Sequence, residues 1–227
     1  MNTPTITLTS GHAIPQLGLG TWKSPETEVG TAVQYALETA GYTHIDCAKV
    51  HGKEIGQALH AVFSSGTIKR EDVFITSKLW NADHDPKTVE AVCRQTLADL
   101  QLEYLDLYLM HWGIAFAGGK GAEPRLENGD IELGAYSLES TWHAMEHLVE
   151  LGLVRSIGVA NFSTVQLLDM LSYAKVPPAM NQIELHPYNS QQALVDFCHK
   201  HSIAVTAYSP LGNRSRLQPG DPVLLED

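Results

Sequence analysis

The sequence predicts an α/β fold built on a parallel β-sheet. Seven short apolar runs alternate along the chain with amphipathic segments of helical period. Near-continuous apolar runs of this length are typical of parallel strands that are buried on both faces. Alternation repeated this often predicts right-handed crossovers, which either close such a sheet into a barrel or wind it doubly.

The elements can be assigned in chain order. A small hairpin is expected before the main fold, because residues 6–8 and 13–14 flank the turn-forming Ser10-Gly11-His12. The seven expected strands of the sheet follow it, at residues 17–19, 43–47, 73–77, 105–110, 156–159, 179–184 and 203–208.

Helices are predicted between these strands. Apolar side chains recur every three and four residues over 29–40 and over 89–100, and Ser163 with Gln166 predicts a capping box that opens a third helix. We count six helices between seven strands, whereas a (β/α)8 barrel needs eight of each. The polar segment 113–136 is expected to be a loop at the face where barrels bind substrates.

We expect one domain over residues 1–227. Within it, residues 1–16 form the N-terminal hairpin, residues 17–212 form an incomplete barrel of about seven βα units, and residues 213–227 form a loop-like tail in which Val223-Leu224-Leu225 is the only apolar run. An eighth strand and the last helices are missing from this pattern.

Composition narrows the class of function. The chain has 227 residues, a net charge of −11 and 44% hydrophobic residues, which indicates a soluble globular protein. Such an acidic surface repels phosphate backbones and anionic lipids, so nucleic acid and membranes are not expected partners. Three widely spaced cysteines and no secretory signal favour reduced thiols and a cytoplasmic location. Nothing in the sequence indicates an oligomeric state.

Three polar residues are the first candidates for chemistry. Asp46, Lys78 and His111 each follow or end a predicted strand, and in a barrel the carboxyl ends of the strands converge on one mouth. Asp46 and Lys78 are expected to pair, and a neutral His111 could hold a carbonyl oxygen by a hydrogen bond. Any one of them alone would more often be structural; their convergence favours a site.

Five segments, one of which contains Asp46, together with those around Lys78 and His111, make the chain similar to one family over nearly its whole length. It resembles the aldo-keto reductases. The resemblance implies an NADPH-dependent carbonyl reductase on a (β/α)8 barrel. The five segments are Gly18-Leu19-Gly20-Thr21-Trp22, Gly41-Tyr42-Thr43-His44-Ile45-Asp46-Cys47-Ala48, Ser156-Ile157-Gly158-Val159-Ala160-Asn161-Phe162, Asn181-Gln182-Ile183-Glu184-Leu185-His186-Pro187-Tyr188 and Ala207-Tyr208-Ser209-Pro210-Leu211-Gly212.

The resemblance implies a set of roles. Asn161 and Gln182 would hold the nicotinamide carboxamide of NADPH, and Tyr208 would stack on its ring. Ser209 and Leu211 would meet the pyrophosphate. Thr21 and Trp22 would lie near the nicotinamide ribose. The substrate pocket would be lined by Trp22, Trp80 and Trp112. NADH is not excluded as an alternative cofactor, and a Rossmann-type glycine fingerprint is absent from the sequence.

Four departures from the family set this chain apart. The acid Tyr expected five residues after Asp46 is replaced by His51, and the loop that follows is two residues shorter than the family pattern. Ala160 stands where the family usually has Ser, and Gly113 where it usually has Pro. The fourth departure is the missing C-terminal part, from which we interpret the chain as truncated relative to the family.

Two functions therefore stand beside each other. The first is a reductase of aldehydes and ketones that uses Asp46, His51, Lys78 and His111, with its activity impaired by the altered acid. The alternative is a non-catalytic member that binds a nucleotide or a protein partner. A metal site formed by His44, Asp46, His51 and His111 is less favoured, because Lys78 would repel the cation.

Overall fold

The seven-stranded sheet expected from the sequence forms the centre of the molecule. The computed structural model describes residues 3–25 and 27–213. All neighbouring strands of the sheet run parallel, in the sequential order β3 to β9. The strands are β3 (Leu19–Gly20), β4 (His44–Asp46), β5 (Phe74–Leu79), β6 (Leu105–Met110), β7 (Val154–Ala160), β8 (Met180–Glu184) and β9 (Ala204–Tyr208).

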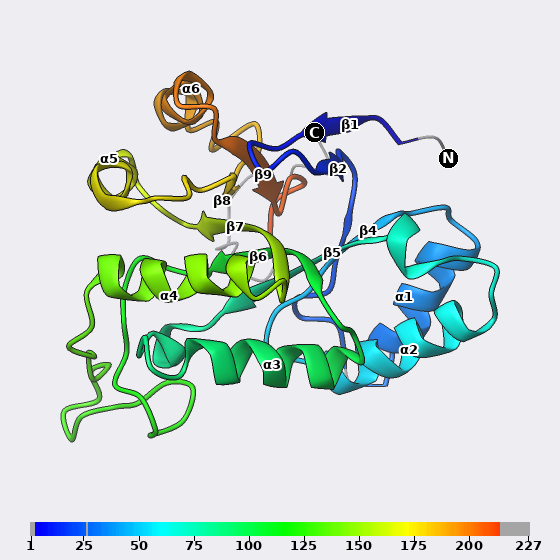
Figure 1. Ribbon diagram of the computed structural model, residues 1–227, viewed down its shortest axis with the longest axis horizontal. Coiled ribbons are helices and arrows are strands. Elements are labelled where there is room, and N and C mark those ends of the chain that lie inside the picture. The colour runs from blue at the N-terminus through cyan, green and yellow to red at the C-terminus, as the bar shows by residue number, and fades with distance from the viewer. Residues whose placement is uncertain (1–2, 26, 214–227) are drawn as a thin grey trace, which may run out of the picture.

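One helix follows each of the first six strands, as predicted (Figure 1). Ser163 caps the fifth of them through the predicted capping box with Gln166. Two short 3-10 helices, Arg70–Asp72 and Asn81–Asp83, flank β5. The helices are α1 (Val29–Glu38), α2 (Gly52–Ser64), α3 (Val89–Leu100), α4 (Leu138–Glu150), α5 (Thr164–Tyr173) and α6 (Gln192–Lys200).

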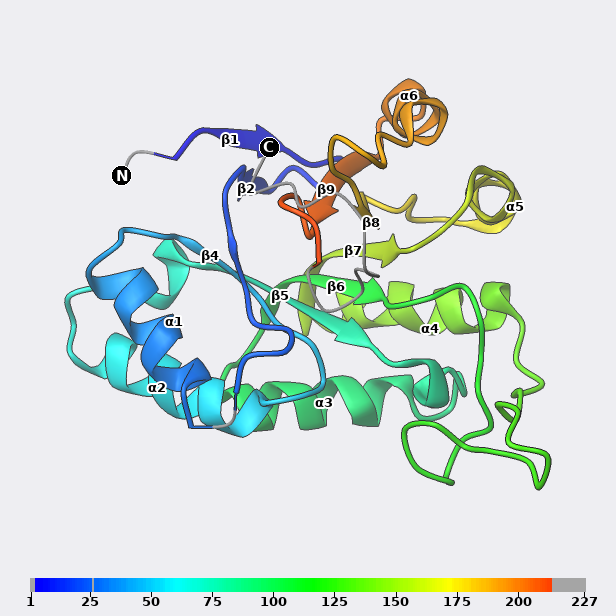
Figure 2. The same cartoon turned by 180° about the vertical axis from the view of Figure 1, so that it is seen from behind.

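The sheet curves toward a barrel but stays open. Within the described residues, β3 and β9 are its two edges and do not pair with each other. Residues of all six helices join the core on the outer face of the curved sheet, and the view from behind shows α5 and α6 set apart from α1 to α4 (Figure 2). The incomplete barrel of seven strands expected from the sequence is therefore confirmed.

The N-terminal hairpin covers one end of the sheet. It consists of β1 (Thr5–Thr7) and β2 (Ala13–Pro15), paired antiparallel. Leu8 and Ile14 pack with inward-facing strand residues in a buried cluster that is separate from the main core. The hydroxyls of Ser10 and Ser156 lie 2.7 Å apart, which ties the hairpin turn to β7 near its amino end. At the opposite, carboxyl end of the strands, a cleft opens beside β7 and β8.

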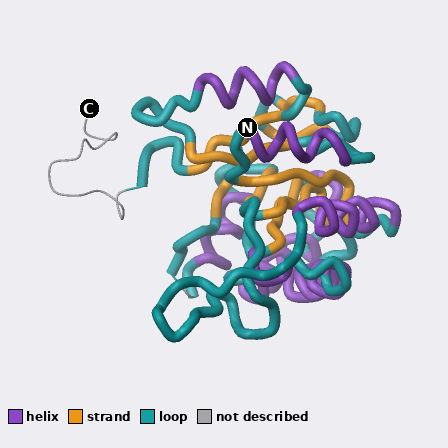
Figure 3. The backbone as a smooth tube through the Cα atoms, turned by 90° about the vertical axis from the view of Figure 1, so that its left-hand side faces the viewer, coloured by secondary structure: helices purple, strands orange, loops and turns teal. Residues whose placement is uncertain are grey.

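The main core lies between the sheet and its outer helices, the layers that Figure 3 separates by colour. Strand residues alternate between this layer and the barrel interior, because successive side chains point to opposite faces. Ile75 and Tyr108, for example, join the outer core, whereas Phe74 and Leu107 join the cluster beneath the hairpin. Fully buried Trp142 of α4 is the largest outer side chain.

Other expectations are met in part. Segment 113–136 forms the expected loop, which folds back on itself through bridges from Phe116 to Leu133 and from Arg125 to Ile131. Cys47, Cys93 and Cys198 are free and buried. No helix among the described residues has the length and apolar character needed to cross a membrane. Most of the tail expected at 213–227, including its apolar run, lies outside the described residues.

Helices α2 and α3 approach each other at a glycine, and this contact yields a stability prediction. A Cβ built on Gly56 would lie 2.1 Å from the backbone oxygen of Asp99, so Gly56→Ala must separate the helices. Overpacking of this kind costs about 1–3 kcal/mol. We expect urea unfolding to show a loss in that range. Gly20→Ala is the matched control, since its Cβ would meet no atom within 4 Å; equal losses in both variants would contradict the prediction.

Candidate active site

The site begins with an ion pair between two strand ends. Asp46 is the last residue of β4, and Lys78 lies one residue before the end of β5. The Lys78 ammonium pairs with Asp46 Oδ1 and also donates a 2.8 Å hydrogen bond to the Cys47 carbonyl. The Lys78 side chain is 6% exposed, and that of Asp46 is 19% exposed. The pairing expected from the sequence is confirmed.

Asp46 is fixed from two more directions. Its backbone oxygen accepts hydrogen bonds from both the amide and the hydroxyl of Thr21, each at 3.0 Å. Its second carboxylate oxygen, Oδ2, accepts a 2.7 Å hydrogen bond from Gln182 Nε2 across the mouth of the barrel. Residues from β5 and β8 therefore meet at the Asp46 carboxylate, and Thr21 after β3 holds the backbone of the same residue.

His111 supplies a neutral imidazole beside this pair. Its ring lies edge-on to the Trp80 ring, with 5.0 Å between the centroids. Burial first, and the charge of Lys78 second, lower the pKa of His111 to about 4. The ring is therefore uncharged near neutral pH and can donate or accept a hydrogen bond without carrying a charge.

The ends of β7, β8 and β9 are connected by hydrogen bonds. Asn161 Nδ2 donates to the His111 carbonyl at 3.0 Å, and Tyr208 donates its hydroxyl to Asn161 Oδ1 at 2.9 Å. The Asn161 backbone has φ 60°, a left-handed conformation that Asn tolerates better than most residues. Its amide nitrogen donates to the Gln182 carbonyl. The three residues that the resemblance assigns to nicotinamide thus lie together.

Aromatic side chains border the mouth. Trp22 is half-exposed and Trp112 is partly exposed, while the Trp80 indole donates a 2.7 Å hydrogen bond to the Ala122 carbonyl of the long loop. A cleft of about 780 Å³ opens beside Trp112 and Tyr208. Its other lining residues come from the ends of β7 and β8 and the starts of α5 and α6: Asn161, Phe162, Ser163, Thr164, Ile183, Glu184, Ser190, Gln191, Gln192, Ala193 and Leu194.

The two residues assigned to pyrophosphate lie in a turn after β9. Ser209 adopts a left-handed backbone with φ 48°, and its carbonyl accepts a hydrogen bond from Gly212. Leu211 is largely exposed. The described chain ends two residues after Leu211, at Asn213.

His51 does not join this network. It precedes α2 in a left-handed conformation with φ 65°, and within the described residues it makes no side-chain hydrogen bond or ion pair. The groups that set the pKa of His111 are burial, Lys78, Asp46 and His84, and His51 is not among them. The structure thus brings Asp46, Lys78 and His111 together without His51.

Two observations account for the position of the loop before α2. Lys49 Nζ forms a 2.6 Å ion pair with Asp83 Oδ2 in the 3-10 helix after β5, which holds the loop toward that side. The carboxylate of Glu54 accepts hydrogen bonds from the amides of Thr27 and Gly30, so the first turn of α2 also caps α1. Neither interaction was predicted, because charge pairs between loops leave no periodic signal in a sequence.

The metal alternative finds no support in this arrangement. His44 Nε2 lies 3.1 Å from the Thr76 hydroxyl and its ring packs edge-on to Phe74, among interior residues near the hairpin. Across residues 3–25 and 27–213, no three His, Cys, Asp or Glu side chains are placed to share a metal ion. The two carboxylate oxygens of Asp46 instead accept hydrogen bonds from Lys78 and Gln182.

The departure at Gly113 has a local explanation. The Gln166 side chain donates a 3.0 Å hydrogen bond to the Gly113 carbonyl, and a Cβ at Gly113 would lie 2.3 Å from Gln166 Nε2. A larger residue at position 113 would therefore require this side chain to move. Ala160 is buried in the cluster beneath the hairpin.

Fold and site together define an α/β barrel-type protein with a buried ion pair at its strand ends, and comparison with known proteins gives the family. The model of the Aldo/keto reductase family matches residues 16–219, and the chain belongs to this family. It is 50% identical to aldo-keto reductase family 1 member A1 of Sus scrofa over 227 residues, which covers 98% of this chain and 70% of the relative.

Solved structures agree with this assignment. The aldose reductase of Schistosoma japonicum superimposes with a TM-score of 0.89 at 44% identity, covering 92% of this chain and 70% of that one. The aldose reductase of Giardia lamblia gives a TM-score of 0.85 at 49% identity, covering 88% of this chain and 66% of that one. The expected α/β barrel-type fold is therefore confirmed.

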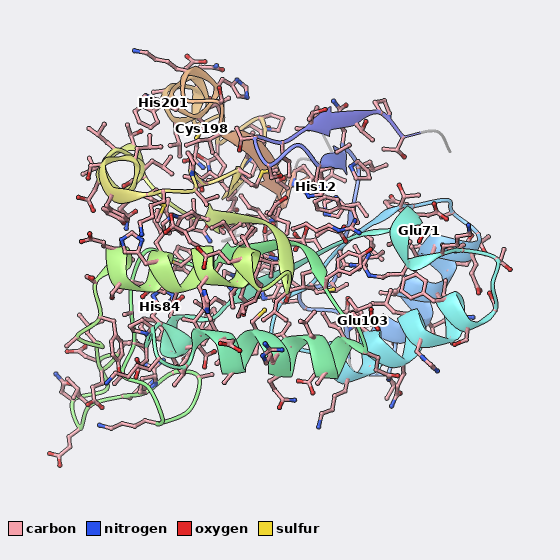
Figure 4. The ribbon with its side chains drawn as sticks, in the orientation of Figure 1. His12, Glu71, His84, Glu103, Cys198 and His201 are labelled. Atoms are coloured by element: carbon pink, nitrogen blue, oxygen red, sulfur yellow. The ribbon has the colours of Figure 1, made fainter. Side chains whose placement is uncertain are left out.

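His84 is a buried residue that sequence reasoning missed, and it yields a pH prediction. It lies between α3 and α4 (Figure 4), is 0% exposed, and neither ring nitrogen has a partner among the described residues. Burial lowers its pKa from 6.5 to about 4. Below pH 6.5 the unfolded chain takes up a proton that the folded chain excludes. Stability is therefore full above about pH 6.5 and falls toward pH 4.

We expect His84→Leu to reduce this acid sensitivity. One excluded proton changes the free energy of unfolding by at most about 1.4 kcal/mol per pH unit. His111 keeps its own share of the slope, since its pKa is also lowered to about 4. Urea unfolding between pH 7 and 4 measures the slopes. His12→Leu, at an exposed position, is the control. A slope in His84→Leu equal to that of the wild type would disprove the assignment.

Proposed function

We propose that this protein reduces small aldehydes and ketones to alcohols with NADPH at the carboxyl end of its barrel strands. The observation that carries the proposal is the buried Asp46–Lys78 pair beside a neutral His111, between Trp80 and Trp112. Membership in the Aldo/keto reductase family supports it. Three buried free thiols are consistent with a cytoplasmic location, which we propose with it.

The residues present fit the nicotinamide end of the cofactor. Asn161 and Gln182 offer amide groups for the carboxamide, and Tyr208 offers a ring face from the neighbouring strand. Thr21 and Trp22 lie on the ribose side in this assignment, with Ser209 and Leu211 at the pyrophosphate. When bound, NADPH supplies the hydride. The chain's own residues orient it and exclude water from its reacting face.

The substrate carbonyl would lie over His111. A neutral imidazole can donate a hydrogen bond to the carbonyl oxygen, which draws electron density from the carbon that receives the hydride. Lys78 adds a positive charge nearby, and electrostatic stabilisation is strong in a site of low exposure. Trp22, Trp80 and Trp112 would border the apolar part of the substrate.

Proton delivery is the weaker half of this site. General acid catalysis contributes about 10²–10⁴-fold to a rate, and no hydrogen bond or ion pair joins the His51 side chain to Asp46, Lys78 or His111. We propose that His51 is a poor acid and that turnover is slow. The same observation favours a second candidate function: a non-catalytic family member that binds a nucleotide or a protein partner.

The cofactor assignment predicts quenching of tryptophan fluorescence. We expect NADPH to quench the emission of the intact chain as it is added, with NADH as the comparison, because Trp112 lines the cleft beside Tyr208. Asn161→Ala should weaken binding roughly tenfold or more through the loss of hydrogen bonds. Gln34→Ala, on the exposed face of α1, is the control. Absence of quenching by either nucleotide would count against the proposed function.

The acid assignment predicts how turnover responds to changes in the loop. His51→Tyr alone should restore little activity, because the left-handed backbone at φ 65° would direct the phenol as it directs the imidazole. Replacing His51-Gly52 with Tyr-Gly-Asn-Glu should raise turnover of an aromatic aldehyde by about 10²–10⁴-fold.

The control for this experiment is Lys78→Met in each background, which should abolish whatever activity is present. Oxidation of NADPH measures all variants. If the natural chain already turns over as fast as the loop-replaced variant, then His51 is a working acid and the assignment is wrong. If neither turns over while both bind NADPH, the non-catalytic function is supported.

A further inference from the structure

We propose that Asp46 has a second role beside its ion pair: it fixes the orientation of the Gln182 amide, so that an acceptor and not a donor faces the nicotinamide carboxamide. Asp46 is thereby a positioning residue for cofactor recognition. The inference rests on the proposed function, since it concerns the cofactor of that reaction.

The first step is the chemistry of the contact. An ionised carboxylate only accepts hydrogen bonds, and Asp46 Oδ1 is already paired with the Lys78 ammonium. Gln182 donates from Nε2 to Asp46 Oδ2 at 2.7 Å. If the amide turned over, its Oε1 would face Oδ2, and two acceptors would meet at hydrogen-bond distance. The charge of Asp46 therefore selects one of the two amide orientations.

The second step is the position of the other amide atom. Gln182 is 5% exposed, and its Oε1 accepts no hydrogen bond from any described residue. Some buried side-chain atoms have neither a partner nor access to solvent, and Oε1 is not one of them. It therefore keeps access to solvent. It is an open acceptor in an otherwise buried residue. Asn161 differs, because its Oδ1 already accepts from Tyr208 and its Nδ2 already donates to the His111 carbonyl, which leaves one acceptor position and one N–H for a ligand.

The third step is what an open acceptor recognises. The amino group of a carboxamide donates to an acceptor, whereas the acetyl group of a 3-acetylpyridine analogue has no N–H to donate. The two ligands carry the same charge, so long-range electrostatics does not separate them. A fixed Oε1 should favour the carboxamide. An Asp46→Asn side chain has both a donor and an acceptor, which would allow Gln182 to turn and accommodate either ligand.

The bond itself can be measured without cofactor. In the intact protein, the ¹⁵N–¹H spectrum should show a Gln182 side-chain amide with one strongly deshielded, slowly exchanging proton, assigned by its loss in Gln182→Met. That signal should move toward ordinary amide positions in Asp46→Asn. A Gln182 signal with no sign of a carboxylate partner in the wild type would overturn the proposal, whether or not the variants fold.

The consequence is measured by binding. We expect the wild type to bind NADP⁺ at least about tenfold more tightly than its 3-acetylpyridine analogue, and Asp46→Asn to reduce the ratio to within about threefold. Asp46→Asn with Lys78→Met is a second variant that avoids a buried unpaired ammonium. The matched control is Asp99→Asn, which alters an exposed Gln95–Asp99 pair of the same chemistry, with a 3.0 Å hydrogen bond on α3, and should leave the ratio unchanged.

The outcomes separate this proposal from the proposed function. A deshielded Gln182 signal with a collapsed ratio in the Asp46 variants supports the proposal. The same signal with an unchanged ratio overturns it while the reductase assignment stands. If neither nucleotide binds although the signal is present, the proposed function has failed, and the cofactor role of Asp46 fails with it.

Discussion

The buried pairing of Asp46 with Lys78 is the contact on which the rest of the site depends. An ammonium ion that is 6% exposed is tolerated only with a partner, and removing one member of such a pair costs about 3–5 kcal/mol. The pair draws in the Cys47 carbonyl and the Gln182 amide, while burial and then Lys78 lower the pKa of the neighbouring His111. One electrostatic requirement thus joins β4, β5 and β8 at the mouth of the barrel.

Much of the fold could be predicted from the sequence because it follows from short-range patterns. The six residues from Leu105 to Met110 are apolar at nearly every position, and β6 has these same bounds. The capping box formed by Ser163 and Gln166 at the start of α5 was likewise predicted from their spacing. Strand ends were less certain: β7 begins at Val154, two residues earlier than expected, because Val154 pairs with Leu105 of the neighbouring strand.

The part of the site that could be predicted from the residues alone is the part that follows from the convergence of the strand ends in a barrel. That rule placed Asp46 beside Lys78, and the resemblance grouped Asn161, Gln182 and Tyr208. It could not show that Gln182 would bond to Asp46, or that Lys49 would reach Asp83, because these contacts depend on side-chain directions and loop paths. His84 was missed for a related reason: a single His has no sequence pattern that reveals complete burial.

The close approach of α2 to α3 has a consequence for how this family can vary. Because Gly56 packs against the Asp99 backbone, and Glu54 holds the start of α1, α2 cannot slide to absorb a change in the length of the preceding loop. A gain or loss of residues there must be taken up by backbone rotation at its junction with the helix, where His51 has φ 65°. Only certain loop lengths are therefore tolerated at this position. They are the lengths that can reach the fixed first turn of α2 with allowed backbone dihedral angles.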